Sequence, residues 1–305
     1  MKRLLLLLTL VFLISTAQSQ YNWEIGGKIG ASNYLGDIGG GDGSAKGWLL
    51  DMKLVDTKYA VGAFGRYRFS NRWSAGAFLT YLQIAGADNH STNPSRRGRN
   101  LSFKNDMFEL TLRADFTLLN IYDVGGKGYY NPDFKLYIFA GVGALYSNPR
   151  AEYEGEWYNL RELNTELQSY SAIHLVVPGG IGAFFTFNRV NRFGMEVQYS
   201  FASTDYLDDV SSIYADPDAL PSDISRILAN RRGEFVPDNP EDIVPNEANY
   251  TAGNKRGNVS NNDGYMIINF YYSHVLKGKS KFYKKGHYNF LHRKNKKRRK
   301  SRAKF

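Results

Sequence analysis

The sequence contains no cysteine, so disulfide bridges, thiolate metal sites and lipid attachment at an N-terminal cysteine are excluded. Long apolar runs are also scarce. The run at residues 4–14 is too short to cross a bilayer as a helix, and no later run approaches the required length. Tyr, Phe and Gly are abundant instead, with 22, 19 and 30 residues. This composition, arranged in short alternating segments, favours strands over membrane-spanning helices.

The first residues have the organisation of a secretory signal peptide. Lys2 and Arg3 precede the apolar run, and a small-x-small cleavage site follows at residues 17–19. We therefore expect residues 1–19 to be removed on export. A retained N-terminal membrane anchor is the alternative, and the shortness of the apolar run argues against it.

Acidic residues are absent from residues 277–305, which hold 14 Lys or Arg, whereas the rest of the exported chain is acidic. The tail residues that we expect to contact a partner are Lys284, Lys285, Arg293, Lys296, Lys297, Arg298, Arg299 and Lys300. Such a segment could neutralise nucleic-acid phosphates, but export removes it from the cytoplasm, so no nucleic-acid partner is expected. An acidic periplasmic protein, anionic headgroups or the cell wall are the expected targets, and a solvated disordered extension is the alternative.

Period-two alternation of apolar with polar or small residues marks eight candidate strands. They are residues 21–35, 59–69, 73–84, 107–121, 134–146, 175–187, 193–202 and 264–276. Their connections alternate between long and short, which is the asymmetry of outer-membrane barrels with short periplasmic turns and longer external loops. We therefore predict an all-β fold, an eight-stranded antiparallel transmembrane barrel over residues 20–276. A soluble β-sandwich is the alternative.

Three local features are expected within this pattern. Residues 178–180, Pro-Gly-Gly, predict a bulge or kink. A short helix is expected within residues 156–168, and another at residues 222–230, where Ser222 follows a proline and would be the N-cap. Residues 203–263 form a long external loop, and an even number of strands places both mature termini in the periplasm.

Charged residues on the polar faces of these strands would point into the barrel. The set is Glu24, Lys28, Arg66, Arg68, Glu109, Arg113, Asp115 and Glu196. An eight-stranded barrel has only enough interior space for side chains, and charges of both signs would pair there. We therefore expect a packed polar core and no open diffusion channel.

An acidic motif follows the seventh strand. Asp205, Tyr206, Asp208 and Asp209 lie in the segment TDYLDDVSSIY at residues 204–214. Clustered carboxylates could bind a divalent cation, but the fixed spacing of a calcium-binding loop is missing. The favoured interpretation is that these carboxylates bind Arg side chains or backbone N–H groups where the loop folds over the barrel mouth.

The sequence offers little for catalysis. Ser171 and His174 could suggest a lipid-modifying hydrolase, but a three-residue spacing on an extended chain puts them on opposite faces, and no acidic partner is identifiable. The histidines show no metal-ligand spacing. We therefore expect a protein that is not an enzyme, with no cofactor, no metal and no identified small-molecule substrate.

Four stretches carry a family resemblance. They are WEIGGKIGASNYLGDIG at 23–39, FKLYIFAGVGALYSNP at 134–149, VVPGGIGAFFTFN at 176–188 and TDYLDDVSSIYADP at 204–217. In this order they resemble the PorG-like outer-membrane β-barrel proteins of Bacteroidota, and SNYLGDIG and TDYLDDVS are the most specific parts. The resemblance spans residues 23–276. The long insertion after residue 217 and the basic extension after residue 277 depart from the short members of that family.

The resemblance implies a function in the type IX protein secretion or gliding machinery. Members of the PorG-like family are linked to a periplasmic ring built from a lipoprotein and its partner. The expected function is therefore an outer-membrane anchor, surrounded by lipid, that docks such a complex from the periplasm. A small surface barrel with an adhesive or envelope-stabilising function, acting through its external loops, is the alternative.

Overall fold

The computed structural model describes residues 22–39, 54–122, 124, 132–237 and 245–276. The expected signal peptide and the basic tail lie outside these residues. The description below concerns the compact unit from Trp23 to Leu276.

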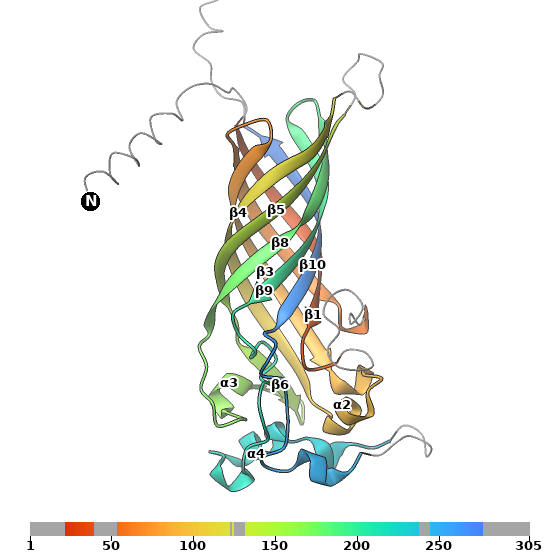
Figure 1. Ribbon diagram of the computed structural model, residues 1–305, viewed down its shortest axis with the longest axis vertical. Helices are drawn as coiled ribbons and strands as arrows, with labels where there is room; N and C mark the ends of the chain where they lie inside the picture. The colour runs from red at the N-terminus through yellow and green to blue at the C-terminus, as the bar shows by residue number, and fades with distance from the viewer. Residues whose placement is uncertain (1–21, 40–53, 123, 125–131, 238–244, 277–305) are drawn as a thin grey trace, which may run out of the picture. The chain divides into compact units, whose positions relative to one another are not determined.

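Eight long strands form the barrel wall (Figure 1). They are β1 (Trp23–Leu35), β2 (Lys58–Arg68), β3 (Trp73–Ala87), β4 (Ser102–Ile121), β5 (Asp133–Tyr146), β8 (Ile173–Phe187), β9 (Asn191–Ala202) and β10 (Gly264–Val275). Each strand pairs antiparallel with its neighbours, and the β1–β10 and β3–β4 ladders complete the ring. The amide of Leu276 donates to the carbonyl of Trp23 at 2.8 Å, which extends the seam between the first and last strands. The predicted eight-stranded antiparallel barrel is confirmed.

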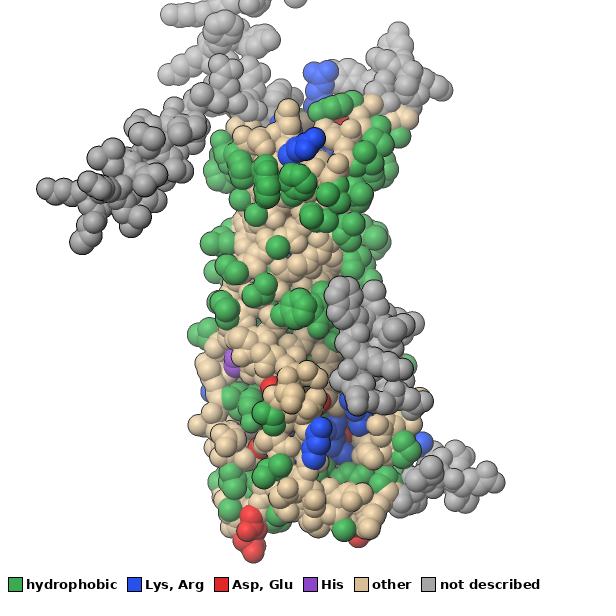
Figure 2. All heavy atoms as spheres, viewed as in Figure 1, with side chains coloured by type: hydrophobic (Ala, Val, Ile, Leu, Met, Phe, Trp, Pro, Cys, Tyr) green, Lys and Arg blue, Asp and Glu red, His purple; other side chains and the backbone are tan. Residues whose placement is uncertain are grey.

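The outer face of the wall is apolar. Ile29, Leu112 and Phe270 expose 67%, 64% and 62% of their surface. Figure 2 shows hydrophobic side chains gathered over the strands, with charged side chains toward the two ends. Such a continuous apolar surface is a liability in water and is the expected lipid-facing surface of a barrel.

Aromatic pairs mark both borders of this apolar belt. At the tight-turn end, Trp23 packs against Tyr67 with ring centroids 5.0 Å apart. Toward the loop end, the ring centroids of Tyr59 and Tyr81 are 6.0 Å apart. Tyr67 and Tyr59 are eight residues apart on β2, which corresponds to roughly 20 Å of barrel height for a tilted strand. This spacing is close to the height of the apolar band in outer-membrane barrels, where aromatic girdles lie at the two interfaces.

The strand ladders depart from two local expectations. Residues 178–180 do not form a bulge: the ladder from β8 to β5 omits Val177 and Pro178 and then resumes in the same register. Because proline lacks an N–H, the ladder loses a rung there without shifting. The irregularity lies in β4, between Thr117 and Leu119. In addition, β4 begins at Ser102, inside the expected loop, because residues 102–106 pair with the end of β3.

The expected short helix within residues 156–168 is present as α3 (Leu160–Leu163), and a hairpin precedes it. Strands β6 (Pro149–Tyr153) and β7 (Glu156–Asn159) pair with each other, and β6 extends the edge of β4. Glu154 and Gly155 have positive φ angles of 53° and 85°, which suits the two-residue turn that joins hairpin strands. Only α3 (Leu160–Leu163) is helical in this segment.

The remaining elements are short and form a cap over the loop end of the barrel (Figure 1). They are η2 (Leu54–Asp56), η3 (Asp88–His90), α2 (Pro94–Arg99), η4 (Pro217–Ala219), α4 (Asp223–Ala229), η5 (Arg232–Glu234) and η6 (Glu247–Tyr250). The predicted N-cap of α4 is confirmed, because the Ser222 side chain accepts a hydrogen bond from the Ser225 amide. No helix in the described part of the chain has the length and apolarity to span a membrane.

Candidate functional site

The barrel interior is organised around Glu196. Its Oε1 lies 2.8 Å from Arg113 Nη2 and 3.2 Å from Arg66 Nη2, and the Tyr137 hydroxyl donates to the same oxygen at 2.5 Å. These side chains come from four strands and are all buried. Gly182 allows this packing, because a Cβ there would lie 2.5 Å from the Tyr137 ring. The centre of the barrel is therefore a filled polar core.

The other acidic residues inside the barrel are paired as well. Glu24 contacts Arg192 and accepts a hydrogen bond from the Ser273 hydroxyl at 2.5 Å. Asp115 lies 2.8 Å from Arg66 Nε. Glu109 has neutral partners instead, and accepts hydrogen bonds from Tyr265 and Gln198.

The structure places all the predicted interior charges inside the wall, with Arg68 only half-buried. The buried members are Glu24, Lys28, Arg66, Glu109, Arg113, Asp115 and Glu196. At the tight-turn end, a cavity of about 20 Å³ remains between the side chains. This volume can hold a water molecule, but it is too small for solutes to diffuse through. The barrel interior that the structure describes is therefore filled by side chains.

The acidic motif folds inward at the loop end of the barrel. Asp208 accepts hydrogen bonds from the backbone amides of Ile38 and Val210, at 3.1 and 2.9 Å. Asp209 accepts from the hydroxyls of Thr165 and Tyr170, at 2.5 and 2.7 Å. The motif therefore ties three loops together.

Tyr206 extends this network sideways. Its ring stacks on Tyr170 with centroids 4.6 Å apart, and its hydroxyl donates to Glu166 at 3.4 Å. Asp205 is different, because neither of its buried carboxylate oxygens accepts a hydrogen bond of regular geometry from any described residue, although Ser211 is close. The motif residues lie near one another but bind different partners.

The carboxylates of the cap do not converge on one point. Among the described residues, no group of three or more His, Asp or Glu is arranged to hold a metal ion. The interpretation that the motif satisfies backbone and side-chain donors therefore fits Asp208 and Asp209 better than cation binding.

Burial changes the protonation of these carboxyl groups. It raises the pKa of Asp205 to about 7 and that of Asp209 to about 6, the latter despite Arg256 nearby. Burial and the neighbouring Asp37 raise the pKa of Asp208 well above its usual range. The cap therefore holds several acids whose ionised form is disfavoured by lack of solvent.

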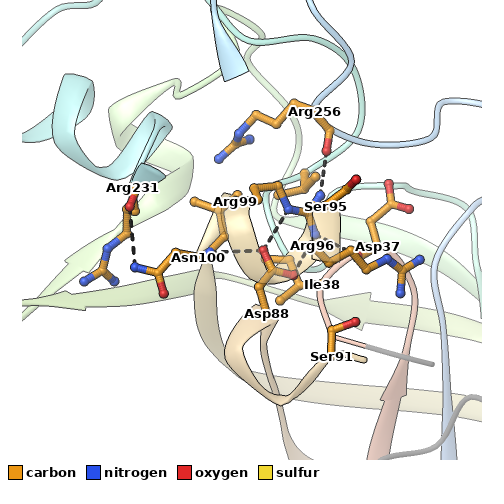
Figure 3. A network of polar contacts seen from close by, with 12 residues as sticks. Asp37, Ile38, Asp88, Ser91, Ser95, Arg96, Arg99, Asn100, Arg231 and Arg256 are labelled. Atoms are coloured by element: carbon orange, nitrogen blue, oxygen red, sulfur yellow. Dashed lines mark hydrogen bonds and ion pairs between the residues drawn. The ribbon is translucent and has the colours of Figure 1, made fainter. Parts of the chain in front are cut away.

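Two buried arginines hold the cap loops together, and Figure 3 shows the first of them. Arg99 binds both oxygens of Asp88, with Nε and Nη2 at 2.7 and 2.8 Å. Its Nη1 also donates to the carbonyl of Arg256, and Nη2 to that of Asp37. A single guanidinium therefore fixes three loops in one arrangement.

Arg256 holds the other side of the cap. Its Nη1 lies 2.8 Å from Glu166 Oε1 and donates to the carbonyl of Asp209 at 2.6 Å, while Nε donates to the carbonyl of Ala229. The long loop before β10 is thereby fixed against the loop before β8.

A cavity of about 600 Å³ lies within this cap. It is lined by Asp37, Asn93, Ser95, Arg96, Arg99, Tyr214, Asn249, Tyr250, Asn254, Lys255, Arg256, Gly257, Asn258 and Asn261. Apart from Asp37 and Tyr214, sequence reasoning placed these residues in featureless loops. The available signal was a local excess of Asn with Arg and Lys between residues 249 and 261, inside a loop that is acidic overall.

The hydrolase alternative finds no support in the geometry. The Ser171 hydroxyl donates to the carbonyl of Ile173 at 2.9 Å rather than to His174, whose Nε2 has no partner among the described residues. A nucleophile and a base in hydrogen-bond contact are therefore missing from this pair.

The closed ring of eight antiparallel strands, the apolar belt and its aromatic borders define an outer-membrane β-barrel with a filled interior. More particularly, residues 2–218 match the family described as Domain of unknown function (DUF6089). The chain belongs to that family. Among curated proteins there is no match.

Several solved structures resemble this one. The N-terminal β-barrel domain of Pseudomonas aeruginosa OprF has a TM-score of 0.34 and 7% identity, covering 84% of this chain and 100% of that domain. Yersinia pestis Ail, in complex with the heparin analogue sucrose octasulfate, has a TM-score of 0.34 and 10% identity, covering 84% of this chain and 99% of Ail. OprG from Pseudomonas aeruginosa has a TM-score of 0.33 and 12% identity, covering 86% of this chain and 99% of OprG. The barrel assignment rests on the strand register and not on these overlaps.

Proposed function

We propose that this protein is a non-enzymatic outer-membrane anchor that docks a periplasmic complex of the type IX secretion or gliding machinery. Its tight turns face the periplasm and its cap faces the cell exterior, so both mature termini are periplasmic. The PorG-like stretches of the sequence support this assignment. The filled interior supports it as well, because it leaves no path for a diffusing solute.

The observation that carries the docking surface is the basic mouth at the tight-turn end. The small cavity there is lined by Arg68, Arg72, Lys135 and Arg192, among other residues. The buried acid in its lining, Asp115, is already paired with Arg66, and the nearby Glu24 with Arg192. Exposed Arg72 and Arg189 lie at the tips of two turns at the same end. This end therefore presents positive charge to an acidic partner, and the basic tail would add to it.

A charge-reversal experiment tests this surface. The double variant Arg72→Glu/Arg189→Glu changes two exposed turn residues without touching the interior network. We expect it to reduce the amount of partner that is crosslinked in native membranes and recovered with the barrel. Deletion of residues 277–305 would show how much the tail contributes.

The matched control reverses two arginines of the cap, Arg161→Glu/Arg226→Glu. If partner recovery is unchanged in the turn-end variant and in the tail deletion, the docking proposal is wrong. If recovery or cell adhesion instead depends on the cap variant, the surface-barrel alternative is favoured. That alternative has its own structural support, the cavity held open in the cap.

A further inference from the structure

We propose that the cavity in the cap is a binding site for an acidic oligosaccharide, a ligand with many hydroxyl groups and at least one anionic group. The site lies at the opposite end of the barrel from the basic mouth. It is therefore independent of the partner that the turn end docks.

The size and lining of the cavity suit a sugar better than an apolar ligand. A volume of about 600 Å³ falls within the range of small-molecule sites. The lining contains five asparagines, Asn93, Asn249, Asn254, Asn258 and Asn261, and no Leu, Ile, Val, Phe or Met. Amide groups both donate and accept hydrogen bonds, which matches the pattern of a polyol.

Tyr214 supplies an unused polar group in this lining. Its side chain is buried, with 3% of its surface exposed, yet its hydroxyl has no hydrogen-bond partner among the described residues. The neighbouring Tyr250, with ring centroid 6.1 Å away, donates its hydroxyl to the Ser95 carbonyl. A buried hydroxyl without a partner is costly, so a ligand group that binds Tyr214 would recover that cost.

Positive charge gives the site its preference for acids. Lys255 is exposed at the rim, and Arg96 lines the cavity from α2. The acid in the lining, Asp37, already accepts a hydrogen bond from the Asn258 amide at 2.5 Å. Arg99 and Arg256 add to the positive field, although their own donors are used within the cap.

The cavity is also preorganised. The ion pairs of Arg99 with Asp88 and of Arg256 with Glu166 are buried and fix its walls. Gly257 lies so close to the first part of the same β9–β10 loop that a Cβ there would be 2.7 Å from the backbone of Ser211. Ligand binding would therefore not carry the entropic cost of ordering these loops.

Calorimetry on the full chain in detergent tests the proposal. The probes are one trisaccharide in neutral, carboxylated, sulfated and phosphorylated forms, with triglutamate as an acidic peptide. We expect at least one acidic sugar to bind, and the neutral form to bind about tenfold more weakly because it lacks the charge-assisted contacts. If no acidic sugar binds, or if triglutamate binds as tightly as the best sugar, the proposal is overturned.

Two variants localise the site. Tyr214→Phe removes a hydroxyl that no described residue uses, so the fold should be retained while affinity falls about fivefold. Lys255→Gln should reduce the affinity for acidic sugars and leave the weak binding of the neutral sugar unchanged. Arg226→Gln, which neutralises an exposed arginine of the cap outside the lining, is the control. Equal effects of Lys255→Gln and Arg226→Gln, or no effect of Tyr214→Phe, would place the ligand elsewhere.

Discussion

Arg113 Nη2 lies 2.8 Å from Glu196 Oε1, across the inside of the barrel, although 83 residues separate the two in the sequence. Glu196 also faces Arg66. Removal of its charge would take from Arg113 its nearest counterion, with Asp115 next at 3.7 Å, and from Arg66 one of its three. A buried charge that loses a close partner is strongly destabilising.

We therefore expect Glu196→Gln, which keeps the shape of the side chain, to lower the free energy of unfolding by about 3 kcal/mol. Urea unfolding of the refolded barrel in detergent would measure the change. Glu162→Gln, at an exposed position in α3, should change it by less than about 0.5 kcal/mol. Equal stability of the two variants would show that the interior network is not a source of stability.

Because the interior is filled, we predict that the barrel conducts no ions. The protein reconstituted in planar bilayers should give no large, steady conductance, because Arg66, Arg113 and Glu196 and their partners occupy the lumen. A porin reconstituted in the same way is the positive control. Steady ohmic current from this protein alone would contradict the closed barrel.

The cap should become less stable as the pH rises from about 4 to about 7. Burial raises the pKa of Asp205 to about 7 and that of Asp209 to about 6, above the value near 4 of an unfolded Asp. Between these pH values the folded cap binds more protons than the unfolded cap, so its stability falls with rising pH. Hydrogen exchange or limited proteolysis of the cap loops would measure this trend.

Asp205→Asn should weaken that pH dependence and protect the cap at pH 8. The control is Asp218→Asn, at an exposed position in η4, which should follow the unmodified protein. Cap protection that is the same at pH 5 and pH 8 in the unmodified protein would disprove the assignment of these buried acids.

Arg99→Lys tests whether the cap depends on guanidinium geometry. A lysine keeps the charge but cannot bind both oxygens of Asp88 and the carbonyls of Arg256 and Asp37 at once. We expect faster proteolysis of the cap loops with an unchanged barrel, as judged by heat-modified electrophoretic mobility. Arg226→Lys, at an exposed arginine of α4, should have no effect on either measurement.

The wall of this protein could be predicted from the sequence because a strand repeats every two residues. The inward positions of Glu109 and Arg113, and the outward positions of Leu110 and Leu112, follow from alternation alone. Strand ends were less exact. At the N-terminal end of β4, the mostly polar residues 102–106 pair with β3 beyond the apolar belt, where no apolar face marks them as a strand.

The cap could not be predicted in the same way. The partners of Arg99 lie on other loops, and the carbonyl of Arg256 is 157 residues away in the sequence. Loop residues carry no period that would reveal such contacts. The acidic motif was recognised from the types of its residues, but its attachment to Thr165, Tyr170 and Ile38 depends on how the loops meet.

The seam between β1 and β10 couples the two ends of the folding unit. Ser273 donates to Glu24 although the two are 249 positions apart in the sequence, and the strands pair from Glu24 with Val275 to Leu35 with Gly264. Before β10 pairs with them, β1 and β9 would each expose unpaired backbone N–H and C=O groups to lipid, which offers no hydrogen-bond partners. Insertion should therefore be all-or-none with respect to the last strand. A chain truncated before residue 264 should be degraded rather than accumulate as a smaller barrel.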